Sequence, residues 1–201
     1  MFFEVFKLLG AYKDNEDVST DTPLMAASAN GHVETVKLLI DEGADKDKQD
    51  FRGFGHTALI LAAQCGQPNV VKLLIDEGAD KNKQDKTGKT ALISAASLNY
   101  LRCAKILINE GADKDKQDDK GHTALIKAVK LRRSEIVKVL IDAGADKDKK
   151  DFDGKTALMH ALFNGSGAEV VELLKDEETR ADPMQNFWNL LPYFRQRRYN
   201  A

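Results

Sequence analysis

One tripeptide recurs along the chain at a nearly constant interval, and this period restricts the folds that the chain can adopt. Gly-Ala-Asp begins at Gly43, Gly78, Gly111 and Gly144, at spacings of 35, 33 and 33 residues. A degenerate copy begins at Gly10, 33 residues before Gly43. Such a period indicates a repeated unit that must stack on its neighbours, because one unit alone cannot bury its apolar side.

A second marker keeps the same interval and predicts where helices begin. It reads Thr-Pro-Leu or Thr-Ala-Leu, and its copies begin at Thr22, Thr57, Thr90, Thr123 and Thr156. Threonine is a favourable N-cap, because its hydroxyl accepts a hydrogen bond from a free backbone N–H of the following helix. Pro23 suits the first helical position, where the N–H that it lacks is not needed.

A second helix is predicted in each unit from its apolar pattern. Val36, Leu39 and Ile40 stand at spacing i, i+3, i+4, and the later units repeat this pattern. The Gly of Gly-Ala-Asp then ends the helix, where a left-handed residue is required. Small residues such as Ala62-Ala63 and Ala95-Ala96 line the first helices and allow neighbouring units to approach closely. The polar residues that follow form a projecting turn.

The turn between the two helices also favours a left-handed residue. Glycine stands there at Gly31, Gly66 and Gly165. Asn99 tolerates this conformation, whereas Arg132 adopts it only with strain.

With these motifs in order, the unit resembles the ankyrin repeat over about residues 1–180. The resemblance implies an all-α fold, an ankyrin-repeat solenoid of stacked helix–turn–helix units with projecting β-turn fingers. We expect a single domain over residues 1–182, and its parts are a partial unit 1–17 and repeats 18–50, 51–85, 86–118, 119–151 and 152–182. The histidine that usually follows Thr-Pro-Leu in the family is replaced by Met25, Ile60, Ile93, Ile126 and Met159. We expect apolar packing there in place of a polar network.

Residues 183–201 match no repeat and leave two interpretations open. The aromatic part, which contains Trp188, covers the last hydrophobic face as a cap, because an uncovered solenoid end promotes aggregation. Alternatively, the segment is a recognition peptide with the basic end 195–198.

Composition excludes several classes of protein. The net charge of -2 argues against a nucleic-acid binder, which needs a basic excess to displace phosphate counterions. No apolar run is long enough to span a bilayer, so we expect no membrane partner. Two cysteines, Cys65 and Cys103, make no disulfide framework. Cys103 is expected in the core and Cys65 on the binding side. A cytoplasmic location is expected, with the nucleus or a host-cell cytosol as alternatives.

The candidate chemical motifs do not predict an enzyme. Segment 45–50, Asp-Lys-Asp-Lys-Gln-Asp, lacks the glycine and the final acidic residue of a calcium loop, so we interpret it as a solvated charged edge. The four histidines, His32, His56, His122 and His160, have no metal-ligand spacing, and His56 and His122 are interpreted as surface variation. No catalytic triad can be assembled. We therefore expect no metal, no cofactor and no catalysis.

The resemblance implies that a partner lies against the first helices and the projecting turns. The candidate partner-binding residues are the non-consensus positions Phe51, Arg52, Phe54, His56, Lys86, Lys89, Leu98, Lys120, His122, Lys130, Phe152, Lys155, His160 and Phe163. Among them Phe51, Phe54, Phe152 and Phe163 are the expected anchors, because exposed aromatic rings bury much area at low entropy cost. For Phe152, folding onto an adjacent turn is an equal alternative.

The lysines of this set make the middle of the surface basic and predict a partner with an acidic segment. The sequence thus predicts a monomeric module that binds a partner protein. The alternative is a structural or tethering subunit that docks through residues 183–201.

Overall fold

The computed structural model describes residues 22–50 and 53–175, and the regular structure within them is helical. The helices are α2 (Pro23–Ala29), α3 (Val33–Asp41), α4 (Ala58–Gln64), α5 (Pro68–Asp76), α6 (Ala91–Leu98), α7 (Leu101–Asn109), α8 (Ala124–Lys130), α9 (Ser134–Asp142), α10 (Ala157–Asn164) and α11 (Ala168–Leu174). The segments 1–17 and 183–201, together with Phe51 and Arg52, lie outside the described residues.

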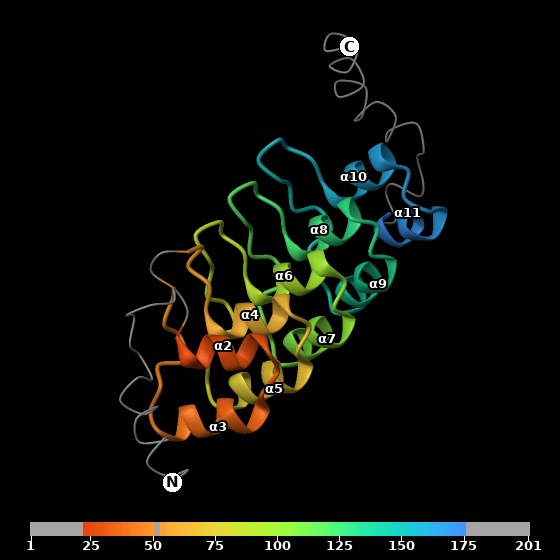
Figure 1. Ribbon diagram of the computed structural model, residues 1–201. Coiled ribbons are helices and arrows are strands. Elements are labelled where there is room, and N and C mark those ends of the chain that lie inside the picture. Colours follow the sequence, from red (N-terminus) through yellow and green to blue (C-terminus); the bar gives the residue numbers. More distant parts are fainter. Residues whose placement is uncertain (1–21, 51–52, 176–201) are drawn as a thin grey trace.

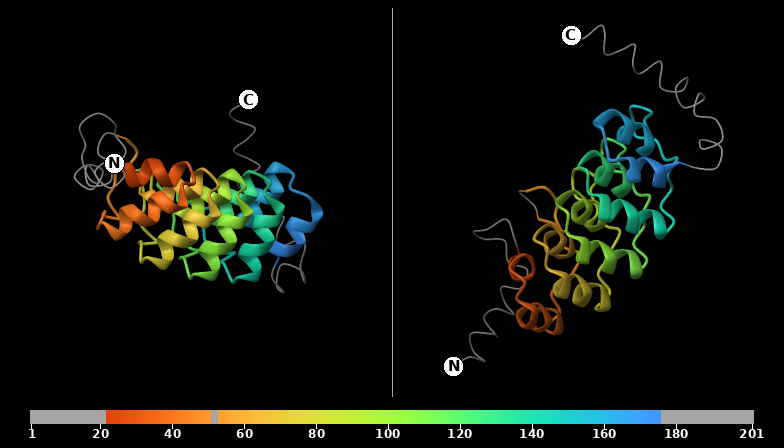
Figure 2. Two further views of the ribbon diagram at one scale, coloured as in Figure 1. Left: turned by 60° about the horizontal axis from the view of Figure 1, so that its bottom comes forward. Right: turned by 90° about the vertical axis from the view of Figure 1, so that its right-hand side faces the viewer.

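The helices form two layers that run the length of the stack (Figures 1 and 2). The first layer contains α2, α4, α6, α8 and α10, each packed on the next, and the second contains α3, α5, α7, α9 and α11. Each first-layer helix also packs on the second-layer helix that follows it in the chain. This is the stack of helix–turn–helix units that the 33-residue period predicted. Within the described residues, no helix has both the length and the apolar character that crossing a membrane requires.

The predicted N-caps are confirmed at every first-layer helix. The hydroxyls of Thr22, Thr57, Thr90 and Thr123 each accept a hydrogen bond from the backbone N–H three residues later, at 3.2 Å. Thr156 does the same at 3.3 Å. Each cap satisfies one donor that a helix start otherwise leaves free, so one local feature begins five helices.

The core lies between the two layers and between consecutive units. Ala62, Ala95 and Ala128 are fully buried, and their small side chains allow first-layer helices to approach one another. The residues that replace the family's usual histidine are Met25, Ile60, Ile93 and Ile126, and all four are buried in the same core. The predicted apolar packing is confirmed at these four positions. Met159, in the last repeat that the structure describes, is only partly buried.

The predicted left-handed residues occur where the sequence places them. Gly43, Gly78, Gly111 and Gly144, at the second-layer helix ends, have φ between 75° and 86°. In the turn between the layers, the two non-glycine residues with positive φ are Asn99 at 66° and Arg132 at 57°. The strain expected at Arg132 is therefore present, and its guanidinium donates a hydrogen bond to the Asn164 carbonyl of the next unit.

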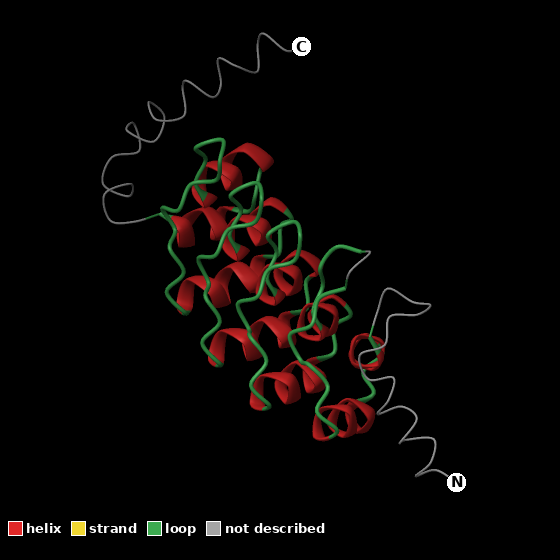
Figure 3. Ribbon diagram, turned by 90° about the vertical axis from the view of Figure 1, so that its left-hand side faces the viewer, coloured by secondary structure: helices red, strands yellow, loops and turns green. Residues whose placement is uncertain are grey.

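The fingers, which connect each second-layer helix to the next first-layer helix, are hydrogen-bonded into one row (Figure 3). The backbone N–H of Lys86 donates to the Phe54 carbonyl at 2.6 Å, and that of Phe152 donates to the Lys120 carbonyl at 3.2 Å. Side-chain amides add a second series of bonds, in which Gln84 Nε2 donates to the Gln117 carbonyl at 2.9 Å. The fingers thus support one another as well as projecting from the helices.

The two thiols occupy different environments, and their reactivity should differ accordingly. Cys103 is buried on α7, and burial raises the pKa of its thiol to about 11. Cys65 is exposed at the end of α4. Because the thiolate is the reactive form, we expect only Cys65 of the folded chain to react rapidly with a disulfide reagent at neutral pH, with Cys103 reacting after denaturation. Time-resolved thiol titration with and without urea measures this, and two equally fast thiols in the native chain would contradict the burial.

Candidate protein-binding face

The fingers and the first-layer helices together present one continuous side of the stack. We call this side the finger face, and its described parts are residues 45–50, 53–56, 80–89, 113–122 and 146–155 with α2, α4, α6, α8 and α10. Every described member of the predicted partner-binding set lies on these segments. Exposure and contacts then distinguish the members that a partner can reach from those that hold the fingers in place.

Large apolar side chains are exposed along the finger face. Phe54 is 64% exposed, Phe152 is 72% exposed and Leu98 is 49% exposed. Leu131, which follows α8, is 44% exposed. Phe152 lies against Gly121 of the neighbouring finger, with which its backbone also pairs, and most of its ring still remains exposed. Exposed aromatic rings on this side of the stack are candidates for contact with a partner.

Phe163 is less exposed than Phe54 and Phe152, the other two expected anchors that the structure describes. It is partly buried at the end of α10, and Lys155 Nζ lies 6.0 Å from the centre of its ring. This cation–π contact joins the ring to the finger that precedes α10. Phe163 is therefore a supporting contact at the edge of the face, and Phe54 and Phe152 are the accessible rings.

Lysines surround these apolar groups. Lys86, Lys120 and Lys130 are exposed, and Lys89 and Lys155 are partly exposed. Asp119 and Asp153 are the acidic side chains at the exposed tips of the third and fourth fingers, and Asp153 contacts Lys155 at 3.6 Å. These five lysines outnumber Asp119 and Asp153, whereas the other exposed aspartates of the fingers lie at the start of each finger, next to the second-layer helix.

A buried aspartate closes each finger, which corrects part of the solvated-edge interpretation. The aspartates at the ends of the four charged motifs are Asp50, Asp85, Asp118 and Asp151, and all are buried. Asp85 Oδ1 accepts hydrogen bonds from the Thr87 N–H at 2.8 Å, the Thr87 hydroxyl at 2.7 Å and the Lys89 N–H at 2.9 Å. The first residue of each motif, as at Asp45, is exposed, and the residues between it and the last aspartate are at least partly exposed. The last aspartate is a structural acceptor that shapes the finger.

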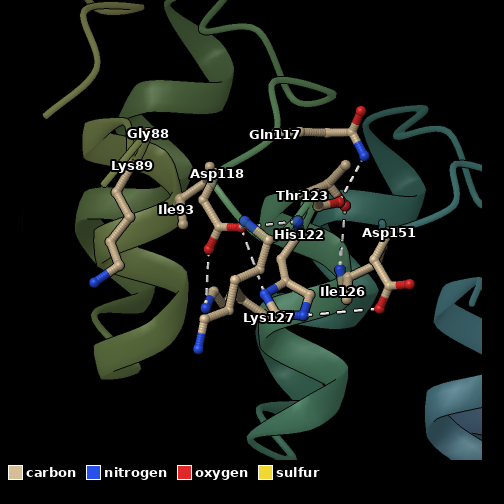
Figure 4. A network of polar contacts seen from close by, with 12 residues as sticks. Gly88, Lys89, Ile93, Gln117, Asp118, His122, Thr123, Ile126, Lys127 and Asp151 are labelled. Carbon is tan, nitrogen blue, oxygen red and sulfur yellow. Dashed lines mark hydrogen bonds and ion pairs between the residues drawn. The ribbon is translucent and has the colours of Figure 1, made fainter. Parts of the chain in front are cut away.

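The prediction that His122 is a surface residue is wrong. The side chain is buried at the base of the third finger, between the aspartates of two neighbouring fingers (Figure 4). Its Nδ1 lies 3.5 Å from Asp118 Oδ1, and its Nε2 lies 3.8 Å from Asp151 Oδ2 and 2.8 Å from Lys130 Nζ. Its equivalent two units earlier, His56, is partly exposed, and its ring centre lies 5.5 Å from that of Phe54.

His160, another predicted partner-binding residue, is also buried. It lies on α10, and its Nε2 is 2.6 Å from Asp151 Oδ2. The rings of His122 and His160 meet edge to face with their centres 6.1 Å apart. These histidines therefore meet each other and Asp151 across the junction of two repeats, and neither presents its ring to a partner.

The charges at this junction affect one another's protonation. Burial lowers the pKa of His122, and Lys130 and Lys127 lower it further. Burial also lowers the pKa of His160, although its hydrogen bond to Asp151 opposes this change. Both rings are thus neutral at neutral pH.

The pKa values of the two buried carboxylates are also lowered, which keeps these groups in their charged form. Burial opposes the charged form of Asp118, but hydrogen bonds from the His122 N–H and from Lys127, whose Nζ lies 3.0 Å away, hold its pKa below the usual value. Burial also opposes the charged form of Asp151, but hydrogen bonds from the Lys155 N–H and from His160 hold its pKa below the usual value. The junction therefore combines neutral imidazoles with charged carboxylates.

Comparison with known proteins places this arrangement in a family. A model of ankyrin repeats, three copies long, matches residues 2–85, 25–118, 71–151 and 110–187. A comparison with curated proteins finds no match. The matches overlap across most of the sequence and agree with the helix pairs and fingers described above. The chain belongs to the ankyrin-repeat family.

Proposed function

We propose that this protein binds a partner protein through the finger face, without catalysing a reaction. Ankyrin repeats are protein–protein interaction modules, and a partner that spans several units meets a surface whose fingers are already hydrogen-bonded into position. The observation that carries the proposal is the exposure of Phe54 and Phe152, two large rings that the core does not use. Aromatic side chains of this kind are frequent hot spots of protein interfaces.

The partner segment is proposed to be acidic. Lys86 stands beside the Phe54 finger, to which its Nζ donates a hydrogen bond at the Gly53 carbonyl, 3.1 Å away. Lys120 lies in the finger whose backbone pairs with that of Phe152. A partner segment with carboxylates between apolar residues can contact both the lysines and the exposed phenylalanine rings. Its negative charge also attracts it to the face before it docks. The free thiols of Cys65 and Cys103 support a reducing compartment, and we propose the cytoplasm.

Replacing both accessible rings tests this proposal. We expect Phe54→Ser combined with Phe152→Ser to weaken partner binding at least about 30-fold, because two hot-spot truncations each cost about 1 kcal/mol or more. The melting temperature should stay nearly unchanged, because exposed substitutions alter stability by at most about 0.5 kcal/mol. The partner is first identified by mass spectrometry of proteins retained by the unaltered chain, and its affinity for each variant is then measured by calorimetry.

The control is a pair of substitutions on the opposite layer. Arg102→Ser with Lys105→Ser changes two exposed side chains of α7 and should leave the affinity unaltered. Equal binding by the double phenylalanine variant and the unaltered chain would refute the finger face as the binding surface. If deletion of residues 183–201 removed binding instead, the tethering alternative would be favoured.

A further inference from the structure

Three potential metal ligands converge at the junction between the last two described repeats. They are His122 Nε2, at the base of a finger, Asp151 Oδ2, in the next finger, and His160 Nε2, on α10. Their ligand atoms all lie within 4.8 Å of one another, and all three residues are buried. We propose that His122, Asp151 and His160 form a binding site for Zn²⁺.

The distances suit a tetrahedral ion after small side-chain movements. Zinc lies about 2.0–2.2 Å from nitrogen and oxygen ligands, which places ligand atoms about 3.4 Å from one another in a tetrahedral site. The distance from Asp151 Oδ2 is 2.6 Å to His160 Nε2 and 3.8 Å to His122 Nε2, so the two values lie on either side of that spacing. Two neutral imidazoles and one carboxylate are a donor set that zinc accepts, with a fourth position left for water or a partner's side chain.

The groups that lie next to the ligand residues, and can hydrogen-bond to them, are also arranged as metal sites require. Asp118 Oδ1 lies 3.5 Å from His122 Nδ1, a buried nitrogen with no hydrogen bond in the structure. When His122 Nε2 binds a metal, its Nδ1 carries the proton, and a nearby carboxylate is the usual acceptor. Asp151 Oδ1 accepts hydrogen bonds from the N–H groups of Asp153 and Lys155, so its other oxygen is free to face the histidines.

Lys130 competes for the same position. Its Nζ lies 2.8 Å from His122 Nε2, where the metal would bind. The residue as a whole is exposed, so its flexible side chain can turn toward solvent when an ion enters. We therefore expect Lys130→Ala to bind Zn²⁺ more tightly than the unaltered chain, about 10-fold, because no ammonium group has to be displaced.

Two repeats earlier, a histidine and an aspartate recur in the arrangement of His122 and Asp151, but without a second histidine. We call this pair a half-site. His56 Nε2 lies 3.8 Å from Asp85 Oδ2, the distance that separates His122 from Asp151, and His56 Nδ1 lies 3.5 Å from Asp50 Oδ2. The position equivalent to His160 holds Ser94, which is buried. The residue equivalent to the competing lysine is Gln64. The described repeats therefore contain one complete site and one incomplete site of matching geometry.

The experiment uses the full chain, stripped of metal with a chelator, and titrates it with Zn²⁺ in a calorimeter. We expect one site that depends on His160, with His160→Ser weakening binding at least about 100-fold, because loss of outer-shell partners alone costs about 10- to 100-fold. Co²⁺ should give the strong visible absorption of a tetrahedral site in the unaltered chain and lose it in this variant. His56→Ala serves as the matched control and should bind like the unaltered chain.

Ser94→His keeps the test decisive if His160→Ser fails to fold. This substitution completes the second half-site, so the folded variant should bind one more Zn²⁺ than the unaltered chain. Zinc binding of equal strength in the unaltered chain and in folded His160→Ser would overturn the proposal. An unchanged stoichiometry in folded Ser94→His would count against it equally.

Discussion

Replacing Leu107 by alanine is expected to lower the free energy of unfolding by about 4 kcal/mol, in the upper part of the range for buried leucines. Leu107 lies on α7 and is fully buried. This helix packs against α5 and α9 in neighbouring units and against α6 in its own. Since each repeat contacts only its neighbours, weakening a central unit also weakens both of its interfaces. Urea denaturation followed by circular dichroism measures the change.

Leu174 provides the control near the end of the described stack. It is buried on α11, which packs on α9 and α10. With fewer packed neighbours among the described helices, Leu174→Ala should cost about half as much, and it should loosen the end of the described stack before the centre unfolds. A Leu107→Ala variant that lost less stability than Leu174→Ala would contradict the packing described for the central repeats.

Replacing Asp85 by alanine should cost about 3 kcal/mol of unfolding free energy. Its Oδ1 accepts two backbone N–H groups and one hydroxyl, and removing it leaves these partly buried donors without an acceptor. Each such donor costs about 1–3 kcal/mol when solvent cannot replace the bond fully. His56 Nε2, 3.8 Å from Asp85 Oδ2, also loses its neighbouring charge. Thermal and urea unfolding of the variant measure the loss.

The matched control is an exposed aspartate of the next finger. Asp119→Ala removes the same functional group from the finger surface and should change stability by at most about 0.5 kcal/mol. Asp85→Asn retains an oxygen acceptor and should recover much of the stability lost by Asp85→Ala. An Asp85→Ala variant as stable as Asp119→Ala would mean that the finger does not depend on its buried carboxylate.

The repeat architecture could be predicted from the sequence because its determinants are local. A threonine before each first helix, apolar residues at helical spacing and a glycine after each second helix each act within a few residues. Even the strained turn at Arg132, with φ of 57°, followed from its alignment with glycines in the other units.

The histidine junction could not be predicted in the same way. In an alignment of the repeats, His122 occupies the same position as His56 of another unit, and this equivalence favours surface variation as the interpretation of both. His122 instead lies between Asp151, in the next finger, and His160, on the following first-layer helix, and these two residues stand at other positions of the repeat. The spacing of 38 positions from His122 to His160 matches no metal motif, because the contact arises only when one finger base is stacked against the following first helix. The nearest sequence signal is His160 itself, on a face where Ser94 and Lys127 occupy the equivalent positions.

Partner binding at the finger face is tested most directly by site-specific photocrosslinking. A photoreactive phenylalanine analogue is placed at Phe54, at Phe152 or, on the opposite layer, at the exposed Lys105, and each chain is irradiated in lysate of the source cells. We expect that one protein, carrying an acidic segment, is crosslinked from both Phe54 and Phe152 and not from Lys105. Crosslinking of a protein from Lys105, with none from either phenylalanine position, would contradict it.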